Sequence, residues 1–106
     1  MSDNGLRFYF LGDDNYVVET ADMIEWADRF KLKQIQTEVA GCVISTVFLG
    51  VDHRTPLRGP GPPLVFETMI FGGTLDRRIW RYSSWDDAEI GHQAAVREAR
   101  RAVTNA

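Results

Sequence analysis

Hydrophobic positions recur with a period of two over most of this chain, which predicts β-strands in those stretches. A hairpin is expected at the start, because two short apolar runs flank a turn made of Gly, Asp and Asn. The nearly continuous apolar run over 42–49 is typical of a central strand covered on both faces. The expected strands are 7–11, 16–19, 33–51 with a turn or bulge at Ala40–Gly41, 64–71, and 78–82 at a sheet edge.

Two segments follow a helical period instead. Asp22, with Glu25 three residues later, resembles a capping box for a helix that ends near Phe30. Ser84 and Asp87 predict the cap of a second helix over about 86–103. The apolar face of the first helix is expected to hold Met23, Trp26, Ala27 and Phe30, and that of the second Ala88, Gly91, His92, Ala95, Val96, Ala99, Ala102 and Val103.

These segments predict the fold class. We expect an α+β fold, a single domain over residues 1–106, with an antiparallel sheet of about five strands and two helices on one face. The length of 106 residues suits one domain, and 44% hydrophobic residues suit a globular core. No run approaches the length of a transmembrane helix, and the start lacks a signal-peptide pattern. The single cysteine, Cys42, excludes a disulfide within the chain and favours the cytoplasm.

Charge is divided unevenly along the chain. Residues 1–53 hold four basic and nine acidic side chains, whereas residues 54–106 hold eight arginines and six acidic side chains. The net charge of −3 argues against a dedicated nucleic-acid binder, which remains a third possibility through the C-terminal arginines. The asymmetry is compatible with two solvated faces or with a partner surface.

Four polar residues are candidates for chemistry. Glu67 lies inside an otherwise apolar strand, so it is either solvated or paired with arginine, or it serves as a ligand-binding or acid–base carboxylate. Asp52 and His53 end the central strand, where functional groups often lie, although His53 could equally anchor the loop. His92 falls on the buried stripe of the last helix, as a satisfied core residue or as a catalyst.

Known motifs for cofactors are missing from the sequence. The histidines follow no metal-ligand spacing, so we expect no metal and no cofactor. The prolines of 57–63 break regular structure and remove the amide donors that a phosphate cradle needs. Arginine and aromatic side chains are the expected ligand- or partner-binding groups beside Glu67, because arginine recognises carboxylate and phosphate and aromatic rings stack. They are Arg54, Arg58, Arg78, Trp80, Arg81 and Tyr82.

Three segments carry a family resemblance that covers roughly residues 20–96. VISTVFLGVDH over 43–53, GPPLVFETMIFGG over 61–73 and RYSSWDDAEIGH over 81–92 resemble segments of small proteins from bacterial phages and prophages. The EWADRF helix over 25–30 is similar to one in the same family. The resemblance implies a phage or prophage origin and the cytoplasm of a bacterial host, and it implies no reaction.

Two functions from different classes follow. The first is a phage or prophage accessory protein that acts as a non-enzymatic binding module for a host or defence-system protein, a phage protein or a small anionic ligand. The alternative is a small hydrolase that uses His53 or His92 with Glu67 or Asp52, with or without a metal. The strand at Trp80–Tyr82 would leave an edge through which a homodimer could form.

Overall fold

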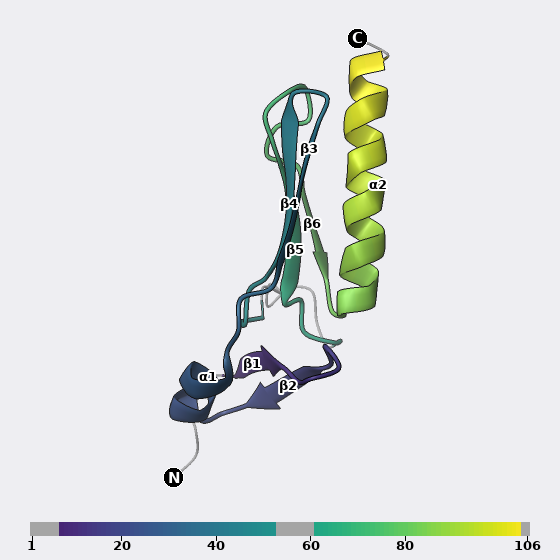
Figure 1. Ribbon diagram of the computed structural model, residues 1–106. Helices are drawn as coiled ribbons and strands as arrows, with labels where there is room; N and C mark the ends of the chain where they lie inside the picture. The colour runs from purple at the N-terminus through teal and green to yellow at the C-terminus, as the bar shows by residue number, and fades with distance from the viewer. Residues whose placement is uncertain (1–6, 53–60, 105–106) are drawn as a thin grey trace.

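The computed structural model describes residues 7–52 and 61–104 and has the expected α+β class (Figure 1). Two antiparallel sheets, one of two strands and one of four, are combined with two helices. In chain order the elements are β1 (Phe8–Leu11), β2 (Val17–Thr20), α1 (Met23–Arg29), β3 (Gln34–Val39), β4 (Cys42–Phe48), β5 (Phe66–Phe71), β6 (Ile79–Tyr82) and α2 (Trp85–Thr104).

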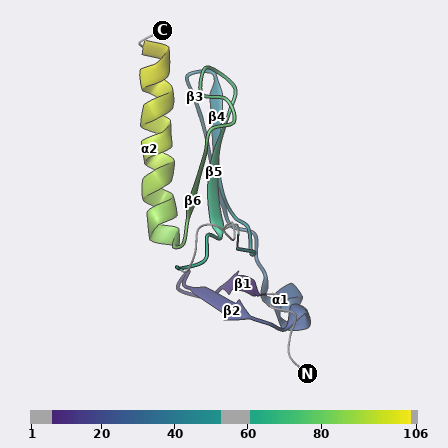
Figure 2. The ribbon, with the colours of Figure 1, turned by 180° about the vertical axis from the view of Figure 1, so that it is seen from behind.

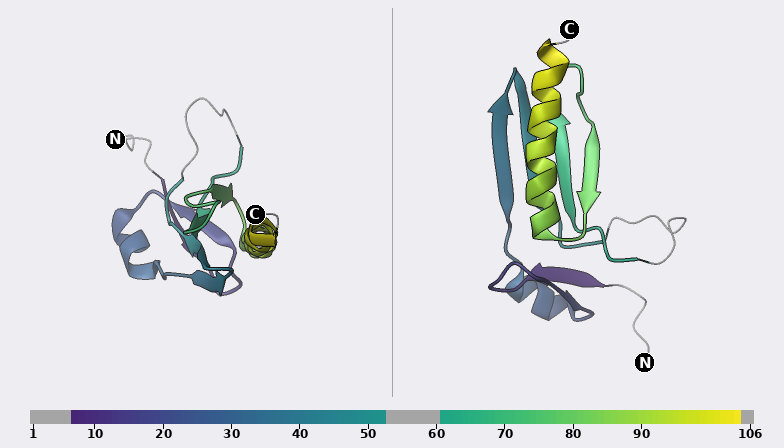
Figure 3. Two further views of the ribbon diagram at one scale, coloured as in Figure 1. Left: turned by 90° about the horizontal axis from the view of Figure 1, so that it is seen from above. Right: turned by 90° about the vertical axis from the view of Figure 1, so that its right-hand side faces the viewer.

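The four-stranded sheet has the order β3–β4–β5–β6, and every neighbouring pair is antiparallel. Val39 pairs with Cys42, so Ala40 and Gly41 form a two-residue hairpin loop with φ angles of 53° and 79°, as a type I′ turn requires. α2 runs along one face of this sheet, and no described helix or strand covers the other face (Figures 1 and 2). Figure 3 shows the helix lying over the sheet.

The arrangement corrects three expectations. β1 and β2 form a separate sheet with α1 packed against it, so only α2 covers the larger sheet, not two helices. β4 is covered on one face alone, since its residues alternate between buried and half-buried along the whole strand. The seven-residue α1 has no buried side chain, and Met23 of its expected apolar face is 57% exposed. A helix so short covers too little area to serve as a layer for a sheet.

Local signals located the helices well. Asp22 caps α1 by accepting hydrogen bonds from the backbone N–H groups of Ile24 and Glu25, and the helix ends at Phe30. Ser84 accepts a hydrogen bond from the backbone N–H of Asp87 at the start of α2. Of the face expected to be buried on α2, Ala88, His92, Ala95, Val96 and Ala99 are buried, while Val103 is half-exposed.

A row of aromatic rings joins the N-terminal hairpin and α1 to the larger sheet. Six rings follow one another with centroid separations of 5.0 to 5.9 Å, namely Phe8, Trp26, Phe30, Phe48, Phe66 and Trp85. The Tyr9 N–H donates to the Gly50 carbonyl, and the Trp26 indole N–H donates to the Tyr9 carbonyl, both at 2.9 Å. The two parts are therefore tied by the packing of the rings and by the backbone hydrogen bond between Tyr9 and Gly50, while the Trp26 bond fastens α1 to β1.

α2 approaches the sheet closely because its inner face is made of small residues. At Gly91 the approach is tightest, because a Cβ atom there would overlap the phenol ring of Tyr82 on β6. The Tyr82 ring is half-buried and packs against the buried cluster that contains Phe48 and Phe66, so the ring has little freedom to move away. Gly91 thus sets the distance between the helix and the strand β6.

We expect Gly91→Ala to lower the free energy of unfolding by about 1–3 kcal/mol, because it overpacks this contact. An alanine in an ordinary helix position would instead stabilise by up to about 1 kcal/mol. Urea unfolding measures the change. In a Tyr82→Ala background, Gly91→Ala should become neutral or stabilising. A stabilising effect of Gly91→Ala in the wild-type background would contradict the tight contact.

Candidate functional site

A layer of polar side chains crosses the space between α2 and the sheet. Above it lies an apolar cluster around Ile44, Ile70 and Val96, and below it another around Phe48 and Phe66. The layer takes one side chain from α2 and one from each strand of the larger sheet. Its members, called the polar layer here, are Thr37 on β3, Thr46 on β4, Thr68 on β5, Tyr82 on β6 and His92 on α2.

The threonine and histidine side chains of the layer all have hydrogen-bond partners. His92 Nδ1 lies 2.7 Å from Thr46 Oγ1, and Nε2 lies 2.8 Å from Thr37 Oγ1. The hydroxyl groups of Thr46 and Thr68 are hydrogen-bonded to each other, and the Tyr82 hydroxyl lies beside Thr68. Thr46, Thr68 and His92 have no solvent exposure. Among the described residues no buried side-chain polar atom lacks a hydrogen-bond partner.

The layer holds a neutral His92. Burial lowers the pKa of His92 from its ordinary value of 6.5, because the charged imidazolium loses its hydration. A neutral ring has one donor and one acceptor nitrogen. If Nδ1 accepts from Thr46, then Thr68 donates to Thr46 and Nε2–H donates to Thr37. The other tautomer reverses each of these donations, so both satisfy the layer.

The hydrogen bonds of the polar layer predict that two threonine substitutions lower the unfolding free energy by different amounts. Thr46 bonds both His92 and Thr68 in a fully buried place, so Thr46→Val should cost about 1–3 kcal/mol of unfolding free energy, because it removes a partner from both of them. Thr37 bonds His92 alone and is half-buried, so Thr37→Val should cost less. Chemical denaturation measures both. Equal losses of unfolding free energy in the two variants would contradict the importance of Thr46 as the bridge between His92 and Thr68.

The lowered pKa of His92 predicts acid sensitivity of the fold. Below about pH 6.5 the unfolded chain binds a proton that the folded chain still excludes, so unfolding takes up a proton. Stability should therefore fall as the pH drops below 6.5, by at most about 1.4 kcal/mol per pH unit, until the folded-state pKa is passed.

The measurement is the unfolding free energy between pH 7.5 and about 4.5 for the wild type and for His92→Gln. The difference between the two curves isolates His92 from other titrating groups. It should narrow toward acid pH, because the wild type alone loses stability from His92 protonation. A constant difference would contradict the lowered pKa.

The structure does not bring His92 and Glu67 together. Glu67 lies on the face of the sheet that points away from α2, where its carboxylate accepts a hydrogen bond from Arg81 Nε at 3.1 Å. The cross-strand register places Glu67 opposite Arg81. The arginine-paired alternative for Glu67 is therefore what the structure shows, and His92 is a satisfied core residue.

Asp52 lies beyond β4, which ends at Phe48, so it does not end the central strand as the sequence predicted. Its carboxylate accepts a hydrogen bond at 2.9 Å from the backbone N–H of Leu64, across the Pro/Gly segment. Asp52 thereby holds the two sides of this connection together. The predicted site residues His53, Arg54 and Arg58 lie outside the described residues.

Three of the predicted binding residues line one groove. Trp80 and Tyr82 of β6, with Arg78 just before the strand, meet Gly91, Ala94 and Glu98 of α2 around a hollow of about 400 Å³. Trp80 and Tyr82 face the helix and are half-buried, so they pack the edge of the core rather than form an exposed stacking surface. Arg81 points to the opposite face with Glu67, so the expected arginine and aromatic set is divided between two faces.

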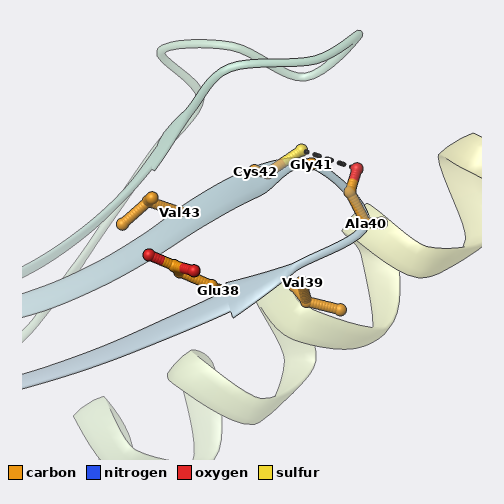
Figure 4. A pocket seen from close by; sticks show the side chains of 6 residues that line it. All are labelled: Glu38, Val39, Ala40, Gly41, Cys42 and Val43. Atoms are coloured by element: carbon orange, nitrogen blue, oxygen red, sulfur yellow. Dashed lines mark hydrogen bonds between the residues drawn. The ribbon is translucent and has the colours of Figure 1, made fainter.

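A second hollow, of about 430 Å³, lies at the β3–β4 turn (Figure 4). It is lined by residues 38–43, among which Val39 points toward α2. Cys42 is buried, and its thiol lies 3.7 Å from the Ala40 carbonyl oxygen as a hydrogen-bond donor. The contact fits a structural cysteine that closes the turn.

The uncovered side of the sheet presents an apolar patch that sequence reasoning missed. We call this side the open face. Phe71 is 47% and Ile79 40% exposed there, and half-buried side chains continue the patch over β4 and β5. Registers Val43↔Phe71 and Met69↔Ile79 make the side chains neighbours. The patch, called the apolar patch below, comprises Val43, Val47, Met69, Phe71 and Ile79, with Ser45 between the two valines on β4.

Comparison with protein-family models, curated proteins and solved structures finds no match to this chain. In residues 7–52 and 61–104 no three His, Cys, Asp or Glu side chains gather in a way that would hold a metal ion. Neither helix in these ranges is long and apolar enough to cross a bilayer.

Proposed function

We propose that this protein is a phage or prophage accessory protein of the bacterial cytoplasm, acting as a non-enzymatic binding module for a host or phage protein through its open face. The observation that carries the proposal is the apolar patch on a sheet face that no described element covers. Contiguous apolar surface on a folded domain is typical of interaction sites. The sequence resemblance supports the phage origin.

The composition of the open face suits a protein partner. Phe71 and Met69 supply an aromatic ring and a thioether, side chains that are enriched at interfaces. The Glu67–Arg81 pair borders the patch on β5 and β6, and Gln34, Gln36 and Glu38 border it on β3. An apolar centre with a polar border is the usual anatomy of an interface. The partner is therefore expected to present an apolar surface of its own.

The chemistry on the other face supports binding rather than hydrolysis. His92 is sealed beneath α2 with both ring nitrogens engaged, so a substrate would reach it only if the helix moved. Glu67, the carboxylate of the alternative function, already bonds Arg81 on the opposite side of the sheet. The described residues thus place no base and carboxylate around one accessible point.

The test is capture of partners from bacterial lysate with immobilised wild type, Phe71→Asp and Ile90→Asp. Both variants place a carboxylate on an exposed apolar position, and Ile90 lies on α2 with 68% exposure, away from the open face. Proteins retained by wild type and by Ile90→Asp should be lost with Phe71→Asp, while all three chains melt at similar temperatures. Retention of the same proteins by Phe71→Asp would refute binding through the open face.

A further inference from the structure

The two edges of the larger sheet differ in how they are protected. β6 is four residues long and carries Arg81, with Arg78 just before it, and short charged strands of this kind discourage pairing. β3 is six residues long, contains no proline, and has one charged residue, Glu38. None of the described helices and strands lies along the outer edge of β3. β3 is therefore the edge that is open to another strand.

The register shows which backbone groups point outward from β3. The Phe48 N–H donates to the Lys33 carbonyl at 2.9 Å, so Lys33 and Phe48 form a hydrogen-bonded pair at the start of β3. Hydrogen-bonded pairs alternate along an antiparallel ladder, so Ile35, Thr37 and Val39 also direct their backbone groups toward β4. The N–H and C=O groups of Gln34, Gln36 and Glu38 consequently point away from the sheet.

We propose that β3 pairs antiparallel with β3 of a second copy of this chain, about a twofold axis at Gln36. In this register Gln34 faces Glu38 of the partner copy and Gln36 faces its own equivalent. The outward N–H and C=O groups of Gln34, Gln36 and Glu38 then all bond to the same three residues of the partner copy. No other antiparallel register of the two strands pairs all of them in this way. The two Glu38 carboxylates are kept apart, and each meets a side-chain amide that can donate to it.

The dimer has room for the other elements. Neighbouring strands lie about 4.8 Å apart, so two α2 helices over the centres of their sheets would be roughly 19 Å apart, well beyond helix contact. The antiparallel arrangement sends the two N-terminal hairpins to opposite ends. Four strands from each copy would form one eight-stranded sheet, and the two open faces would become a single continuous surface.

The register can be tested by introducing lysine at Gln36 and, in a separate variant, at Gln34. Gln36→Lys places two like charges opposite each other across the axis and should raise the dimer dissociation constant about fivefold or more. Gln34→Lys is a matched change on the same face of the same strand. It brings each new charge to a Glu38 carboxylate and should lower the constant. Analytical ultracentrifugation over a range of concentrations measures both.

The decisive experiment mixes two variants that carry opposite charges at position 36. Gln36→Lys and Gln36→Glu should each dimerise weakly alone, whereas an equimolar mixture should form a heterodimer at least as tight as the wild-type dimer. Gln36→Pro removes an N–H that points outward, so the monomer should fold while the dimer is lost. A wild-type chain that is monomeric at high micromolar concentration would overturn the proposal. So would a dimer that Gln36→Pro and both charge variants leave unchanged, since its interface would lie elsewhere.

Discussion

The polar layer is the constraint on which the arrangement of the larger sheet and α2 depends. Apolar packing is non-directional, so the clusters above and below the layer alone would tolerate α2 at several heights along the sheet. A shift of one helical turn would move His92 against Ile44 or Phe48 and leave its ring nitrogens unpaired. Because an unpaired buried polar group costs more than a made hydrogen bond contributes, the layer fixes one height for the helix and one register for the strands.

That register decides what the molecule presents to its surroundings. Once Thr46 and Thr68 point toward α2, the period of two turns Val47, Met69 and Phe71 to the opposite face. A single helix covers one face of the sheet, and the seven-residue α1 packs with the N-terminal hairpin instead of covering the other. The same interaction that takes His92 out of reach of solvent thus exposes the apolar patch. Under the proposed function, the histidine acts indirectly, by determining which side chains face outward.

Sequence patterns predicted the elements better than their arrangement. Strand periods, the cap at Asp22 and the cap at Ser84 are local signals, and the structure confirms the elements that they predicted. Helical spacing predicted that His92 lies on the buried face of its helix. It did not predict which threonine side chains would bond it. Threonine favours strands whether it is buried or exposed, so no local signal marked Thr46 and Thr68. An apolar run likewise does not say whether one face or two are covered, which is why β4 was expected to be buried on both.

The border of the apolar patch limits what the open face can bind. Phe71 and Ile79 alone would favour indiscriminate association, the hazard of any sheet with an uncovered face. The Glu67–Arg81 pair interrupts the apolar surface on β5 and β6, and a partner that buries this pair must match both charges or leave one unsatisfied. Under the proposed function, the apolar patch supplies contact area, whereas the charged pair supplies discrimination. Under the proposed function, Glu67 acts with Arg81 as a determinant of specificity, whereas the sequence alone drew attention to it as a catalytic carboxylate.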